Sequence, residues 1–112
     1  MFCRPPRPAS VLAARPDQLV NMVVARPWAI IDLEPRKAAK APYAIELECP
    51  LLVMGAIKDY ADDKNVALLC DSELYAEAVA IIMIAQGFEN HVALTDRTEW
   101  VEYWEDVDAG RV

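Results

Sequence analysis

The sequence predicts an α/β fold, a five-stranded, mostly parallel sheet with helices on both faces. Two short segments, WAII at 28–31 and NVALLC at 65–70, are almost wholly apolar, which is typical of strands buried on both faces. Segments with apolar residues at helical spacing alternate with the strands, and this alternation indicates a parallel sheet between two layers of helices. The length of 112 residues suits one domain with a single core.

The chain up to the first buried strand is expected to contain an edge strand and a helix. Residues 10–14 form the short edge strand, and residues 15–27 form a helix that begins near Pro16. The apolar residues of this helix recur at helical spacing: Leu19, Met22 and Val23. The buried strand follows at 28–34 and carries Asp32 at its carboxyl end.

The middle of the chain is expected to hold a turn, a short strand and a helix. Residues 35–42 form a basic surface turn. Residues 43–48 form a half-buried strand, because apolar side chains alternate with glutamates there. Residues 50–63 form a helix that is opened by Pro50.

The carboxyl-terminal half is expected to contain two further strands, each followed by a helix. The strand at 65–70 ends on Cys70. The helix at 73–86 ends before Gly87, a residue type favoured just beyond a helix end. A strand at 91–96 and an amphipathic helix at 97–107 complete the fold. The apolar side of this last helix is formed by Trp100, Val101 and Trp104.

Composition narrows the class of protein. We expect a flexible lead at 1–9, one domain at 10–108 and a short tail at 109–112. The net charge of −7 argues against nucleic acid as a partner, because such a surface repels phosphates. The lead is not a secretory signal, and the longest apolar run is too short to span a bilayer. We therefore expect a soluble cytoplasmic protein without a membrane partner.

The cysteines do not form a metal-binding pattern. Cys3, Cys49 and Cys70 are widely spaced, and the single histidine is His91. A zinc site needs closely spaced cysteine or histidine ligands, so the three thiols are expected to be reduced and free of metal. The three glycines do not cluster into a phosphate-binding loop. We expect neither a metal nor another cofactor.

Several reactive or charged side chains are expected at one edge of the sheet. Ligands of open parallel sheets bind outside the carboxyl ends of the strands, where Cys70 lies. Five acidic residues are expected at the same edge: Asp32, Glu34, Asp71, Glu73 and Asp96. They could hold a hard cation, form a solvated acidic edge, or dock a basic partner protein.

The order of the elements, together with particular residues, resembles the rhodanese family. WAIIDLEPR resembles that family's strand ending in aspartate, YAIELE resembles its next strand, and NVALLC resembles the strand that delivers the catalytic cysteine. AQGFENHVALTDRTEWVEYW is similar to the closing segment of the family, where Gly-Phe precedes the last strand and a tryptophan lies in the last helix. The similarity covers residues 10–104.

The resemblance implies a sulfurtransferase or sulfur carrier that forms a persulfide on Cys70. It implies a six-residue loop that curls around the sulfur with its N–H groups, with a helix N-terminus behind, and both features favour an anionic sulfur. The loop residues after the cysteine are Asp71, Ser72, Glu73, Leu74 and Tyr75. Asp32 takes a supporting position. The implied partner is a sulfur donor or acceptor protein, which the acidic edge suggests is basic.

The loop also departs from the family's pattern of C-R-x-G-x-R. Asp71, Glu73 and Tyr75 occupy the three named positions after the cysteine, and Glu34 replaces another arginine of the family. Two carboxylates within about 6 Å would each oppose a thiolate by roughly 2–3 kcal/mol at an effective dielectric near 20. We therefore expect weak or absent activity with thiosulfate.

Two hypotheses about function follow. The protein is a sulfur carrier that uses Cys70, or it is a catalytically degenerate rhodanese-like module that binds a protein partner through its acidic edge.

Overall fold

The computed structural model describes residues 8–36, 39–47 and 64–111. Within them it shows an α/β fold with five strands and three helices, as the sequence predicts. The helix expected at 50–63, most of the lead and two cysteines, Cys3 and Cys49, lie outside the described residues.

The five described strands form one sheet in which all neighbouring pairs are parallel. The strands are β1 (Val11–Ala13), β2 (Trp28–Asp32), β3 (Ile45–Glu46), β4 (Asn65–Leu69) and β5 (Val92–Thr95). Their order across the sheet is β1-β5-β4-β2-β3, so β4 lies at the centre. Apart from the first residue of β4, its side chains are buried, as expected for a strand covered on both faces.

The helices begin where local sequence satisfies their first N–H groups. α1 (Pro16–Ala25) has proline at its first position, where the missing N–H is harmless. α3 (Glu73–Ala85) begins after Ser72, whose hydroxyl accepts a hydrogen bond from Tyr75 N. α4 (Arg97–Asp108) begins after Asp96, whose carboxylate accepts one from Glu99 N. Gly87 follows the last turn of α3 with φ of +100°, as predicted for that position.

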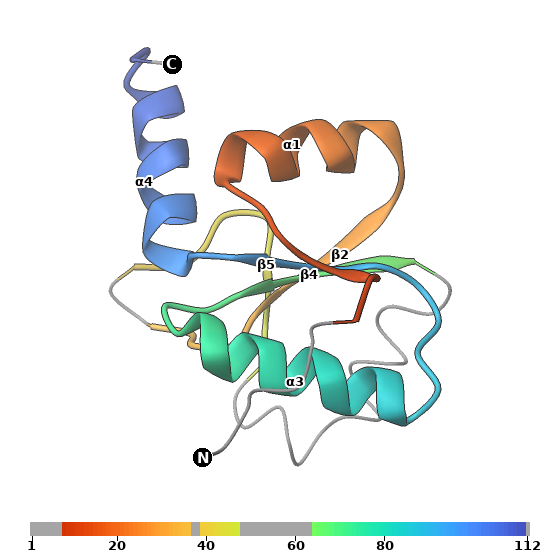
Figure 1. The fold of residues 1–112 in the computed structure, drawn as a ribbon. Coiled ribbons are helices and arrows are strands. Elements are labelled where there is room, and N and C mark those ends of the chain that lie inside the picture. Colours follow the sequence, from red (N-terminus) through yellow and green to blue (C-terminus); the bar gives the residue numbers. More distant parts are fainter. Residues whose placement is uncertain (1–7, 37–38, 48–63, 112) are drawn as a thin grey trace.

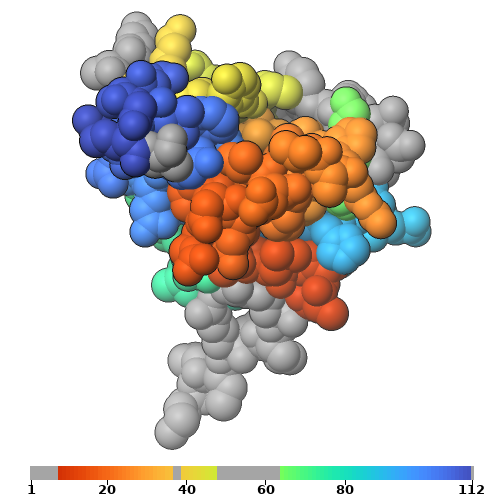
Figure 2. Space-filling model, turned by 90° about the horizontal axis from the view of Figure 1, so that it is seen from above, coloured from red at the N-terminus to blue at the C-terminus, as the bar shows by residue number. Residues whose placement is uncertain are grey.

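The described helices lie on opposite faces of the sheet. Figure 1 shows α1 and α4 above the sheet and α3 below it. Figure 2 looks onto the upper face, where α1 (orange) and α4 (blue) lie beside one another. Leu19 and Trp100 are buried in the core on this face, whereas Val79 and Met83 of α3 are buried in the core on the other. On the apolar side of α4, Trp100 is buried, whereas Val101 and Trp104 are half-buried against the core.

The strand predicted at 43–48 is wrong in its extent and burial. Only Ile45–Glu46 pair with β2, and both side chains are exposed. Tyr43 has φ of +63°, a left-handed conformation that cannot continue a strand, and its side chain is 73% exposed. The alternation of apolar and polar residues was therefore misleading at this edge of the sheet.

The topology creates a crevice at the carboxyl edge of the sheet. The chain leaves β4 for α3 on the lower face, and it leaves β5 for α4 on the upper face. A crevice opens where neighbouring strands send their connections to opposite faces, and ligands of such sheets bind there. Cys70 follows β4 at this point. The described helices include none that is both long and apolar enough to cross a membrane.

Candidate functional site

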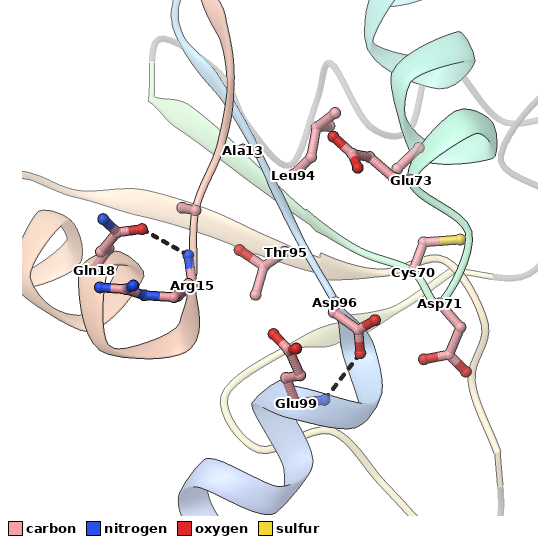
Figure 3. Close-up of a pocket in the computed structure, with 12 residues that line it drawn as sticks. Ala13, Arg15, Gln18, Cys70, Asp71, Glu73, Leu94, Thr95, Asp96 and Glu99 are labelled. Atoms are coloured by element: carbon pink, nitrogen blue, oxygen red, sulfur yellow. Dashed lines mark hydrogen bonds between the residues drawn. The ribbon is translucent and has the colours of Figure 1, made fainter.

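A pocket of about 320 Å³ lies at this carboxyl edge. The ends of β1, β4 and β5 and the first turns of α1, α3 and α4 line it (Figure 3). Cys70, Asp71 and Glu73 contribute from one side, and Thr95, Asp96 and Glu99 contribute from the β5–α4 junction. Of the residues expected at this edge, Cys70, Asp71, Glu73 and Asp96 line the pocket, whereas Asp32 and Glu34 do not.

Cys70 is a buried thiol at the wall of this pocket. Cys70 is only 3% exposed, and it belongs to the core on the α3 face of the sheet, together with aliphatic residues that include Leu68, Ala76 and Leu94. Its backbone is fixed on both sides, because Cys70 N donates to Thr95 O and Arg97 N donates to Cys70 O. The sulfur is thus held at the end of the central strand and is largely shielded from water.

The Cys70 sulfur donates a hydrogen bond to a carboxylate. The distance from Sγ to Glu34 Oε1 is 2.8 Å. Burial and this hydrogen bond raise the pKa of the Cys70 thiol to about 12, although the Ser72 N–H acts in the opposite direction. The Cys70 contact and the Asp71 N–H hold the pKa of Glu34 below its ordinary value. At neutral pH the pair is therefore a thiol and a carboxylate.

The expected loop of amides around the sulfur is largely diverted to other acceptors. Asp71 N donates to Glu34 Oε1 at 2.9 Å, and Tyr75 N donates to the Ser72 hydroxyl at 3.2 Å. Of the loop amides, that of Ser72 has the sulfur as its acceptor. The physical reason is that α3 already begins at Glu73, so the chain turns into a helix before it can curl around the sulfur.

The remaining loop side chains take different positions. Asp71 and Glu73 line the pocket, whereas Ser72 is the helix cap. Leu74 and Tyr75 are exposed and are not among the pocket's lining residues. The loop predicted for substrate binding is thus divided between the pocket and the outer surface of α3.

Asp71 joins three segments at the pocket. Its carboxylate accepts hydrogen bonds from Thr98 N and Thr98 Oγ1 at the start of α4, and from Arg36 on the segment after β2. Burial opposes ionisation of Asp71, but these hydrogen bonds outweigh it and lower its pKa. Arg36 also lies 3.7 Å from Glu34. Asp71 and Arg36 therefore hold Glu34 against the Cys70 sulfur.

The sequence predicted that Asp32 lies with the other carboxylates of the edge, and the structure corrects this prediction. Asp32 is fully buried and pairs with buried Arg97, whose Nε lies 2.9 Å from Asp32 Oδ1. Arg97 also donates to Ala39 O, and Asp32 accepts from Glu34 N. A buried carboxylate needs a partner of opposite charge, and Arg97 meets that need from the start of α4. The pair fastens the end of β2 to α4.

Arg36, Thr95 and Thr98 were not predicted as site residues, and Glu34 was predicted only as one of the carboxylates at the edge. Glu34 gave a signal, because the resemblance to the rhodanese family implies an arginine at its position, but its contact with Cys70 spans 36 residues. Arg36 was interpreted as part of a surface turn. The two threonines gave no signal, since nothing local distinguishes a threonine in a pocket from one elsewhere.

Five carboxylates at the carboxyl edge form what we call the acidic rim: Glu34, Asp71, Glu73, Asp96 and Glu99. Arg36 offsets Asp71 and Glu34 by ion pairs. In the part of the chain that the structure describes, no group of three or more histidine, cysteine or acidic residues is placed to hold a metal ion. The geometry therefore provides no support for the hard-cation interpretation.

A second hollow of about 320 Å³ lies on the upper face between α1 and α4. Val20, Val23, Trp28, Tyr43 and Trp104 are among its lining residues, so its surface is almost wholly apolar. Trp104 packs edge-on against Trp100 at a ring-centroid distance of 5.7 Å. The described residues that line this hollow include no carboxylate or thiol, and none of them lines the pocket at Cys70.

Comparison with known proteins adds no relative: no family model matches the chain, and no curated protein or solved structure is significantly similar to it. The function must therefore be argued from the site itself. A protonated thiol is a poor nucleophile, whereas a pocket bordered by carboxylates can attract and hold a cation.

Proposed function

We propose that this protein is a catalytically degenerate rhodanese-like module that binds a basic protein partner through its acidic rim. The hydrogen bond from the Cys70 thiol to the Glu34 carboxylate is the observation that carries this proposal. It turns the one described cysteine from a candidate nucleophile into a structural donor.

The protonation state of Cys70 argues against sulfur transfer. With a pKa of about 12, about one thiol in 10⁵ is ionised at pH 7. The thiolate is the nucleophile in sulfur chemistry, so this fraction limits the rate. An anionic sulfur donor would also approach the carboxylates of the rim, which repel it.

The position of Cys70 supports the rhodanese-like part of the proposal. The residue follows the central strand of a parallel sheet, and a helix begins three residues later. This arrangement is the one that the resemblance implies for a catalytic cysteine. The changes lie in the loop, which turns into α3 before it can curl around the sulfur, and in the charged side chains beside the sulfur. Both affect whether a thiolate can form.

The charge of the rim supports binding of a basic partner. Five carboxylates lie at one edge, and Arg36 forms ion pairs with two of them, Asp71 and Glu34. Clustered charge of one sign raises association rates and selects partners of the opposite sign. The protein's net charge of −7 acts in the same direction.

A sulfur carrier is the second candidate, because the Ser72 N–H favours an anionic sulfur and α3 begins beside it. It would require Glu34 to move away from the sulfur. The carrier hypothesis predicts a mass increase of one sulfur atom on Cys70 after exposure to a persulfide donor, lost in Cys70→Ser. The binding module predicts that Cys70 stays unmodified.

Selection from a library of random peptides tests the binding function. We expect the protein to enrich peptides with net positive charge. The double variant Glu73→Gln with Glu99→Gln removes two rim carboxylates. It should lower the affinity for the selected peptides about tenfold, because both side chains border the pocket. The measurement is peptide affinity by fluorescence anisotropy at fixed salt.

The matched control changes the same number of charges elsewhere on α4. Glu102→Gln with Glu105→Gln alters two exposed carboxylates that do not line the pocket. The affinity of this control variant for the selected peptides should stay within about twofold of that of the unmodified protein. Equal losses in both double variants, or enrichment of neutral and acidic peptides, would contradict binding through the rim.

A further inference from the structure

The pocket at the carboxyl edge contains a buried hydroxyl without a hydrogen-bond partner. Thr95 is 3% exposed, and its Oγ1 has no partner among the described residues. Figure 3 shows this side chain in the middle of the ring of lining residues, between Arg15 and Asp96. Buried hydroxyls are nearly always hydrogen-bonded, so this one indicates a ligand group that can pair with it.

Two carboxylates next to Thr95 also have unused acceptor atoms. Asp96 Oδ1 accepts from Glu99 N, and no described residue bonds its other carboxylate oxygen. The Glu99 carboxylate makes no hydrogen bond or ion pair with the described residues. Three acceptor groups thus come from one short stretch, the β5–α4 junction, and all three residues line the same pocket.

The charge of the pocket selects a cation. Its lining includes four carboxylates, of which Asp71 is paired with Arg36, and one guanidinium, that of Arg15, which is paired with Asp17. With these two partners counted, the net charge of the lining is about −3. Three helices begin around the pocket, and their N-termini together contribute about +1.5 charges. This positive contribution is smaller than the lining's net charge of about −3, so a cation is favoured over an anion.

The remaining walls suit an aliphatic chain that ends in the charged group. Ala13, Ala14, Ala76 and Leu94 also line the pocket, and the methylene stem of a long basic side chain can pack along such surfaces. A guanidinium has five N–H donors in one plane, so it can reach a hydroxyl and carboxylates together. An ammonium is a point charge without this planar arrangement.

We propose that this pocket binds the guanidinium of an arginine side chain that a basic partner inserts, with Thr95, Asp96 and Glu99 as acceptors. The proposal rests on the proposed function and names the group that the acidic rim recognises. Thr95 accepts at the buried end of the pocket, and the two carboxylates supply the opposite charge nearer its mouth.

The test compares two peptides that differ in one charged group. The first probe is acetyl-Ala-Arg-Ala-amide, and the second carries citrulline, a neutral side chain of nearly the same shape, in place of arginine. Isothermal titration of the full chain should give at least about tenfold weaker binding of the citrulline peptide. Free agmatine, which carries a guanidinium without a peptide, shows whether the peptide backbone contributes.

Three variants locate the binding. Thr95→Val removes the unpartnered hydroxyl and should lower the affinity for the arginine peptide about threefold to tenfold. It should not lower the midpoint temperature of thermal unfolding. Glu99→Gln should lower the affinity for the arginine peptide about tenfold. Glu102→Gln is the matched control on the same helix outside the pocket and should change the affinity by less than about twofold.

The outcomes separate this inference from the proposed function. Equal binding of both peptides, no binding of either, or an unchanged affinity in folded Thr95→Val and Glu99→Gln overturns the arginine site. If basic peptides are then still enriched through the rim, the proposed function stands without this pocket. If agmatine binds as tightly as the arginine peptide does, the pocket recognises a free guanidinium. This result overturns the proposal that a partner protein inserts an arginine side chain.

Discussion

At the scale of single residues, the chemistry of the edge depends on Glu34. Glu34 accepts a hydrogen bond from the thiol, at a position where the resemblance to the rhodanese family implies an arginine that would stabilise a thiolate. The sequence alone predicted that acidic residues around the sulfur, among them Asp71, Glu73 and Glu34, oppose a thiolate at Cys70. In the structure Asp71 pairs with Arg36 and Thr98, and Glu34 is the carboxylate in contact with the sulfur.

The sequence could not identify this contact, for a physical reason. The sulfur and Glu34 are brought together by the parallel pairing of β2 with β4, in which Asp32 lies beside Leu69. The register of two strands separated by over 30 residues depends on the whole sheet. Local patterns predicted that both residues lie at the carboxyl edge, but not which carboxylate meets the thiol.

At the scale of elements, prediction succeeded where burial is complete. The apolar runs of β2 and β4 and the capped helices α3 and α4 follow from local spacing and from Ser72 and Asp96. The predicted β3 was too long. The two residues of this edge strand are exposed, so packing against the core does not determine where the strand begins and ends. The pairing of Asp32 with Arg97 was missed, since 65 residues separate them.

This buried ion pair yields a prediction about stability. Arg97→Met leaves the Asp32 carboxylate buried without its cation, so the free energy of unfolding should fall by about 3–5 kcal/mol. Adding Asp32→Asn should restore part of this loss, because the uncompensated charge disappears. Urea unfolding followed by circular dichroism provides the measurement.

An exposed ion pair serves as the comparison. Arg111 and Asp106 lie 2.7 Å apart at the surface, so Arg111→Met should lower the free energy of unfolding by less than about 1 kcal/mol. Similar losses in Arg97→Met and Arg111→Met would show that the buried pair does not fasten β2 to α4.

At the scale of the whole molecule, the shifted pKa values predict how stability depends on pH. The pKa values of Glu34 and Asp71 are lowered in the fold, so their contribution is present above their ordinary values and is lost as pH falls through the folded ones. The pKa of Cys70 is raised, so its contribution is present below the ordinary value of 9.0 and is lost as pH rises toward about 12.

The expected profile is a plateau from about pH 5 to pH 8, with a decline on each side. On the alkaline side, the difference in free energy of unfolding between the unmodified protein and Cys70→Ala should shrink by roughly 1 kcal/mol per pH unit above pH 9. Urea unfolding over a pH series measures this difference. Parallel profiles of the two proteins above pH 9 would show that the Cys70 thiol is not perturbed.

The fold as a whole agrees with the sequence at the coarse level. The α/β class was predicted, and so were the five strands seen in the part of the chain that the structure describes. The all-parallel pairing sharpens the expectation of a mostly parallel sheet. The charge balance was also readable, because net charge is a sum over residues. What required the structure was the assignment of each charge to a partner.

The pKa of Cys70 is the most direct test of the account. It can be measured by the ¹³Cβ chemical shift of labelled cysteine across pH, with Cys3 and Cys49 replaced by serine so that one thiol titrates. We predict a value well above 10, near the 12 that burial and Glu34 impose, and a decrease of about 1–2 units in Glu34→Gln. A Cys70 pKa at or below the ordinary value of 9.0 would contradict the account.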